Sequence, residues 1–224
     1  MESAFNGDPN DDPNIRDEYG KTSLMNASNK GHIEKVKLLL DKGADPNIVS
    51  PFGITALMDA THNDHTDIVE LLLDNGADID FVSPFGKTAL IGASIIGYRD
   101  IVELLLDRDS NPNIRDYNGV TALMCASGGH IEIVELLLAK GSDPNIVDKF
   151  GGTALMWVTD CGHTDIVKVI NDHIALQNAL QNLAFAKSMN SLTPSLKCLD
   201  YDIMQEIMNC TRTYNHGVKM RMKV

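Results

Sequence analysis

Aromatic residues make up only 5% of this 224-residue chain, which contains a single tryptophan. No apolar run approaches the roughly 18–20 residues that a membrane-spanning helix needs. Residues 1–8 are acidic and lack the charged start and apolar centre of a secretion signal. We therefore expect no membrane partner and an intracellular, cytoplasmic protein.

Cysteine is also scarce, and its spacing gives no sign of a disulfide framework or a metal site. The four cysteines are Cys125, Cys161, Cys198 and Cys210, and no two form a Cys-x-x-Cys pair. Such isolated residues are typical of reduced thiols in an intracellular protein. We expect no metal and no cofactor.

Basic residues are too few for a polyanionic partner. The chain has 19 Lys and Arg against 31 Asp and Glu, a net charge of −12, and residues 1–172 hold 13 of the former and 28 of the latter. Such an acidic surface repels phosphate backbones and anionic lipids, which excludes nucleic acid and membranes as expected partners.

Catalytic patterns are missing as well. Ser, Thr, Cys and His are scattered without a nucleophile–base arrangement, and there is no glycine-rich phosphate-binding loop. The sequence predicts no catalytic residue and a protein that is not an enzyme.

What is present is a repeat. The stretch Ser50-Pro51-Phe52-Gly53-Ile54-Thr55-Ala56-Leu57-Met58 returns four more times, with its glycine at 20, 86, 119 and 151. The period is therefore 33, 33, 33 and 32 residues. Self-similarity at that length indicates a solenoid of stacked units.

Each unit has the pattern of a turn followed by two helices. Gly53 suits a turn that needs positive φ, and Thr55 suits the N-cap of a short Ala-Leu-Met helix. The second helix, residues 66–73, has apolar residues at i, i+3 and i+4, and Gly76 suits its C-cap. Acidic residues line the solvent side of these second helices, so we do not assign them catalysis.

These residues resemble the ankyrin repeat, a 33-residue unit with the signature T-P-L-H-x-A. Here Pro is replaced by Ala or Ser, and His is replaced by Met or Ile, at Met25, Met58, Ile91, Met124 and Met156. The Thr-Ala-Leu-Met variant is similar to arrays of intracellular bacteria and large DNA viruses. The resemblance implies an all-α solenoid of stacked helix-turn-helix units with β-hairpin-like turns, a protein partner, and a cytoplasmic location that includes a host cytosol.

The repeat divides the chain into segments. Residues 1–16 are the remnant of a partial repeat, 17–172 the array, 173–213 a helical cap and 214–224 a basic tail. The array consists of residues 17–49, 50–82, 83–115, 116–147 and 148–172. We expect a monomer, with self-association through the uncapped amino-terminal face as the alternative.

Three departures from the period predict local changes. Asp109 stands where a C-cap glycine belongs, so it is expected to adopt a left-handed conformation. Residues 126–130 form a loop one residue shorter than its counterparts. Residues 164–187 continue a helical stripe without a C-cap glycine, which predicts one long or kinked helix.

The predicted partner-binding residues lie at the hairpin tips. Five of the twelve aromatic residues stand at or near the turn glycine, and apolar residues follow them at places that the family usually fills with polar ones. The set is Tyr19, Phe52, Ile54, Phe85, Ile95, Ile96, Tyr117, Val120 and Phe150. A row of exposed aromatic side chains is an expected anchor set for a protein. In the alternative interpretation, each aromatic packs on the neighbouring hairpin and only stiffens the tips.

A ladder of histidines invites a metal hypothesis that distance rejects. The ladder is His32, His65, His130 and His163, with Tyr98 in the third unit. Stacked helices lie about 8–10 Å apart, whereas zinc–nitrogen bonds are about 2 Å. By the same resemblance, these are loop residues that brace the start of the second helix.

The carboxyl-terminal segment 199–208 is similar to the first helix of F-box-like tails. The matching residues are Leu199, Asp202, Ile203, Ile207 and Met208, while Asp200 replaces the usual Pro. This resemblance implies an alternative function, a substrate-recognition adaptor for a ubiquitin ligase. The other interpretation is a helix packed over the last repeat.

Overall fold

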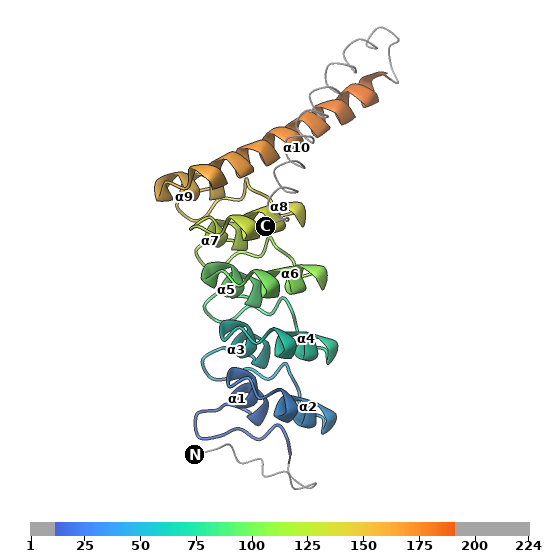
Figure 1. Ribbon diagram of the computed structural model, residues 1–224, viewed down its shortest axis with the longest axis vertical. Coiled ribbons are helices and arrows are strands. Elements are labelled where there is room, and N and C mark those ends of the chain that lie inside the picture. Colours follow the sequence, from blue (N-terminus) through green and yellow to red (C-terminus); the bar gives the residue numbers. More distant parts are fainter. Residues whose placement is uncertain (1–11, 191–224) are drawn as a thin grey trace.

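The computed structural model describes residues 12–190, and side chains as far as residue 185. Within this range ten helices stack in two columns, and a turn projects from one edge of each repeat (Figure 1). The inner column is α1 (Ser23–Asn29), α3 (Ala56–His62), α5 (Ala89–Ile96), α7 (Ala122–Ala126) and α9 (Ala154–Cys161). The outer column is α2 (Ile33–Asp41), α4 (Thr66–Asp74), α6 (Arg99–Asp107), α8 (Ile131–Ala139) and α10 (Thr164–Asn190). The predicted all-α repeat fold is confirmed.

Every inner helix begins at the predicted threonine cap. The threonine hydroxyl oxygen accepts the backbone N–H three residues later, which satisfies one of the free amides of the first turn. The five caps are Thr22, Thr55, Thr88, Thr121 and Thr153, with N···O distances of 3.1–3.4 Å. The start of each inner helix is therefore fixed by local sequence.

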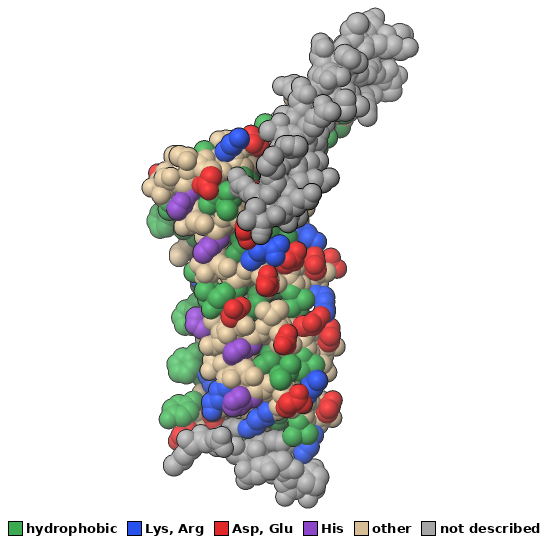
Figure 2. All heavy atoms as spheres, viewed as in Figure 1, with side chains coloured by type: hydrophobic (Ala, Val, Ile, Leu, Met, Phe, Trp, Pro, Cys, Tyr) green, Lys and Arg blue, Asp and Glu red, His purple; other side chains and the backbone are tan. Residues whose placement is uncertain are grey.

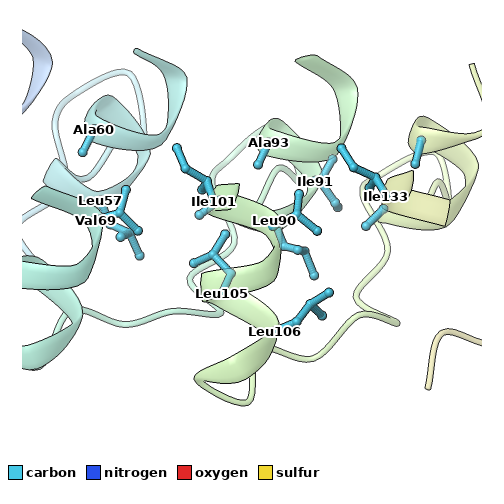
Figure 3. Packing of buried hydrophobic residues seen from close by; sticks show 14 of the residues in the cluster. Leu57, Ala60, Val69, Leu90, Ile91, Ala93, Ile101, Leu105, Leu106 and Ile133 are labelled. Atoms are coloured by element: carbon cyan, nitrogen blue, oxygen red, sulfur yellow. The ribbon is translucent and has the colours of Figure 1, made fainter. Parts of the chain in front are cut away.

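The apolar core runs without interruption through the stack, because each repeat buries its faces against its neighbours (Figure 3). Small residues such as Ala60 and Ala93 on the inner helices are fully buried and let neighbouring helices approach closely. Met25, Ile91 and Met124 are each 1% exposed. At these three positions the residue that replaces the family's His therefore serves as a core residue, whereas Met58 is half-buried and Met156 is exposed.

An asparagine amide links the outer ends of successive repeats. Asn47 Nδ2 donates to the Gly76 carbonyl at 2.9 Å, and Asn47 Oδ1 accepts from the Asp78 amide at 2.7 Å. Asn14 and Asn113 make the same pair of contacts to the repeats that follow them. The amide suits this place because it donates and accepts at once.

The junction between the second and third repeats departs from this pattern. Asp80 replaces the asparagine, and a carboxylate has no proton to donate to a carbonyl. Asp80 Oδ1 instead accepts from the Ser110 hydroxyl at 2.8 Å and from the Asn111 amide at 3.1 Å. Asp109, the residue before Ser110, has φ 63°, which confirms its predicted left-handed conformation.

The histidine ladder also connects repeats. His65 Nε2 lies 3.3 Å from the Asn29 carbonyl oxygen, and the imidazoles of His130 and His163 make the same contact with the repeat before them. A Cβ on Gly31 would lie 2.7 Å from the His65 ring, and Gly31 has φ 73°. Glycine is required there both for close approach and for backbone conformation.

Two further features bear on the sequence predictions. The long helix is present as α10, which spans 27 residues and extends past the stack (Figure 1). The shortened loop accompanies the shortest helix, α7, and Gly129 there has φ 140°. Asp64 has φ 59°, a left-handed residue that the sequence analysis did not anticipate.

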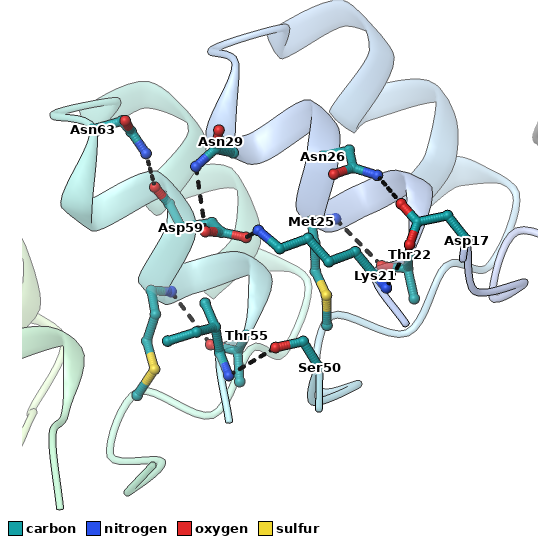
Figure 4. Close-up of polar contacts among 12 residues, drawn as sticks. Asp17, Lys21, Thr22, Met25, Asn26, Asn29, Ser50, Thr55, Asp59 and Asn63 are labelled. Carbon is teal, nitrogen blue, oxygen red and sulfur yellow. Dashed lines mark hydrogen bonds and ion pairs between the residues drawn. The ribbon is translucent and has the colours of Figure 1, made fainter. Parts of the chain in front are cut away.

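A buried carboxylate joins the first two repeats on the inner side (Figure 4). Asp59 is 7% exposed; its Oδ2 lies 3.3 Å from Lys21 Nζ, and its Oδ1 accepts from Asn29 Nδ2 at 3.3 Å. Burial raises the pKa of Asp59 above its usual value, although Lys21, Asn29 and nearby His62 oppose the shift.

We predict that Asn47→Ala lowers the free energy of unfolding by about 1–2 kcal/mol, because two hydrogen bonds between repeats are lost. Asn145→Ala is the matched control, since among the described residues Asn145 forms its hydrogen bonds with Asp143 of its own repeat. Urea denaturation measures both variants. Equal destabilisation would contradict a linking role for Asn47.

We predict that Asp59→Asn is more stable than the wild type at pH 7, because the variant removes a charge whose burial is unfavourable. Lys21 keeps a quarter of its side chain in water and stays hydrated. Because the pKa of Asp59 is raised in the folded state, its protonated carboxyl group favours folding at low pH. This contribution to the free energy of unfolding is lost as the pH rises through that pKa. The advantage of the variant should therefore shrink as the pH falls toward 4, measured as thermal unfolding across this range. A variant that is less stable at pH 7 would show instead that the Lys21 ion pair dominates.

Candidate protein-binding surface

Each hairpin turn is held by the side chain of its first residue. Ser50 Oγ accepts the Ile54 amide at 3.1 Å, and Ser83 Oγ accepts the Lys87 amide at 3.0 Å. In the other three repeats an aspartate Oδ1 accepts two amides of its own turn, at 2.8–2.9 Å. These aspartates are Asp17, Asp116 and Asp148. Such side-chain turns fix the backbone conformation at the tips.

All three aspartates also contact groups outside their own turn, and Asp17 Oδ2 accepts from Asn26 Nδ2 at 2.9 Å. The Gly152 amide, together with Trp157 Nε1 at 2.9 Å, holds the pKa of Asp148 below its usual value. Burial alone would raise the pKa of Asp116, but hydrogen bonds from Lys87 at 2.9 Å and from turn amides outweigh it and lower the pKa. Charged acceptors strengthen the hydrogen bonds that hold these turns.

The predicted aromatic side chains project from these turns into solvent. Their exposed fractions are 67% for Tyr19, 62% for Phe52, 66% for Phe85, 58% for Tyr117 and 89% for Phe150. Hydrophobic side chains accordingly stand out along the left edge of the space-filling view, away from the mixed charges on the right (Figure 2). Tyr117 stands one residue earlier in its turn than the other four, at the place of Pro51.

The exposures also bear on the alternative interpretation of the aromatics. Phe150, which no described hairpin follows, is 89% exposed, whereas the four that precede another hairpin are 58–67% exposed. The four rings that precede another hairpin are thus less exposed than Phe150, and each keeps more than half of its surface in water. Support of the tips and availability for contact are compatible.

Ile95 and Ile96, at the end of α5, are 47% and 37% exposed, and Ile54 is half-buried beside its tip.

The predicted residue Val120 does not belong to this surface, because it is 7% exposed and packs in the core. Lys21 and Lys87 occupy the same repeat position but reach a carboxylate of the following repeat. The short apolar side chain of Val120 turns into the stack instead. We call the five aromatics with Ile54, Ile95 and Ile96 the tip surface.

Sequence reasoning missed two exposed residues of the last inner helix. Met156 is 53% exposed and Trp157 is 37% exposed on α9. A signal was present, because the period ends after this unit, and no further repeat within residues 12–190 covers Met156.

Charges on the outer helices are largely arranged in exposed ion pairs. Arg108 lies 2.6 Å from Asp74 and 3.0 Å from Glu70, and Lys140 lies 2.7 Å from Asp107. Exposed pairs of this kind contribute little to stability. They join neighbouring outer helices across the solvent face of the stack.

Two other kinds of site, a metal centre and a membrane span, are absent from residues 12–190. No group of three or more His, Cys, Asp and Glu is placed to hold a metal ion, and none of the helices is long and apolar enough to cross a membrane. Burial raises the pKa of the Cys125 thiol to about 11, so this thiol stays protonated at neutral pH. The F-box-like residues 199–208 lie outside the described residues.

Comparison with known proteins identifies the family. No curated protein matches the chain. The family model for ankyrin repeats, which describes three copies, matches residues 4–83, 75–148 and 127–209, and together these matches cover most of the chain. The repeat period, the stacked helix pairs and this match agree, and the chain belongs to the ankyrin-repeat family.

Proposed function

We propose that this chain is a non-enzymatic interaction module that binds a protein partner through its tip surface. Ankyrin repeats are generally protein–protein interaction modules, and the family is typically non-enzymatic. The choice of the tip surface rests on the residues of this chain.

The observation that carries the proposal is a row of five aromatic side chains, each more than half exposed, at the repeat period. Aromatic residues dominate the binding energy of protein interfaces, since each buries a large area with few rotatable bonds. An exposed row of this kind marks an interaction site.

Rigidity supports the same conclusion. The turns are fixed by their own Ser or Asp side chains, and the hairpins stack on one another. Little conformational entropy is therefore lost when a partner binds, so more of the contact energy appears as affinity. The outer helices carry exposed ion pairs and not a row of aromatic side chains, so they offer no comparable anchors.

We predict that Phe52→Ala combined with Phe85→Ala reduces partner recovery or affinity by about tenfold or more, because two central anchors are removed. The measurement is quantitative affinity capture from the native or host cell extract, followed by titration of the captured protein. The double variant should unfold within about 1 kcal/mol of the wild type, since both rings are exposed.

The matched control is Leu38→Ala combined with Leu180→Ala. These leucines are 47% and 48% exposed on α2 and α10, away from the tips. The control should bind like the wild type. Equal recovery by wild type and the Phe52/Phe85 variant would reject the tip surface as the binding site.

A further inference from the structure

Two positions of each repeat, four and seven residues after the threonine cap of the inner helix, contribute little to the apolar core. The first position holds Asn26, Asp59, Gly92, Cys125 and Trp157. The second holds Asn29, His62, Ile95, Gly128 and Asp160. Of these ten residues only Cys125 packs against the core. Residues three apart lie on the same side of a helix, so the two positions form one face of the inner column.

In the first two repeats this face is filled by polar side chains that bond one another (Figure 4). Asn26 Nδ2 donates to Asp17 Oδ2 at 2.9 Å, and Asn29 Nδ2 donates to Asp59 Oδ1 at 3.3 Å. These amide and carboxylate groups already have partners within the chain.

The third repeat has a glycine at the first position that the fold does not require. Gly92 lies inside α5 and does not have a positive φ, and a Cβ on it would meet no atom within 4 Å. Other repeats hold Asp or Trp at this position, so the fold accepts a side chain here. Glycine inside a helix is destabilising relative to alanine. The space over Gly92 is therefore open to a partner.

The fourth repeat keeps the neighbouring region open. Helix α7, which packs beside α5 in the inner column, ends at Ala126, and Gly128 stands at the repeat position of Ile95 (Figure 1). Ile95 and Ile96 thus lie beside a repeat that has no side chain at the matching place, and both remain exposed. We call Gly92, Ile95, Ile96, Cys125 and Gly128 the open stretch.

The charge available near the open stretch is negative. Lys87 and Arg99 of the same repeat are already paired, with Asp116 at 2.9 Å and Glu103 at 2.8 Å. The preceding repeat, residues 50–82, contains seven Asp and Glu and no Lys or Arg. Its Asp64, just after α3, is exposed and forms no ion pair with a described residue. Charge complementarity favours a cationic partner.

We propose that the partner is a protein segment that places a large apolar side chain over Gly92, against Ile95 and Ile96, with Lys or Arg close to it in sequence. The proposal rests on the proposed function and specifies the chemistry of the partner. The apolar side chain buries the exposed isoleucines, and the basic residue faces the acidic second repeat.

Selection of random dodecapeptides by display on the immobilised full chain tests the predicted chemistry. The enriched peptides should combine a large apolar residue with Lys or Arg a few positions away, and salt should weaken their binding. Enrichment of acidic peptides, of peptides without a large apolar residue, or of none would overturn the proposal.

Variants of Gly92 locate the binding of the enriched peptides. Gly92→Leu fills the open space and should weaken their binding about tenfold or more. Ala139→Leu, which adds a similar side chain at an exposed place on α8, is the matched control and should bind like the wild type. Gly92→Ala should raise the Tm by about 1–4 °C, because the helix gains a better helix-forming residue. Unchanged binding by Gly92→Leu, or a lower Tm for Gly92→Ala, would overturn the proposal.

The variant that combines Phe52→Ala and Phe85→Ala separates this proposal from the tip surface. Loss of peptide binding in that variant but not in Gly92→Leu would reject the open stretch alone. Loss in Gly92→Leu but not in the Phe52/Phe85 variant would support the open stretch and reject the aromatic tips as anchors.

Discussion

No repeat of this protein can bury its apolar surface alone. Helices of five to nine residues such as α7 and α8 are too short to be stable in isolation, so they persist only because each side packs on a neighbouring repeat. Leu57 and Leu90, from successive inner helices, and Ile101 and Ile133, from successive outer helices, belong to one continuous cluster (Figure 3). Every other feature, including the row of tips, depends on this stacking.

Polar links determine how the stacked repeats are aligned. The asparagine amide at the outer end and the histidine imidazole on the loop each bond backbone groups of an adjacent repeat. Both are directional, whereas apolar contact is not. At the junction of the second and third repeats both links change, because Asp80 bonds Ser110 there and Tyr98 stands in place of the histidine. The alignment of the array is therefore built from repeated backbone contacts with one substituted junction.

The proposed function follows from the separation of two tasks within the repeat. Turn geometry needs the glycine and the Ser or Asp that accepts the turn amides, and stacking needs the Ala-Leu-Met helix. The aromatic residue at the tip serves neither task fully, since more than half of each ring is in water. Its recurrence on a rigid edge is what favours recognition of a protein.

The sequence alone determined the period, the threonine caps, the long last helix and the left-handed Asp109, because these depend on residues close together in the chain. It also placed the aromatics at the tips. Tertiary structure decided the rest: Val120 is buried, Met156 is exposed, and His65 bonds the preceding repeat and does not cap its own helix. These outcomes depend on which repeat lies alongside, and Met156 differs in exposure from Met124 because no described repeat follows α9.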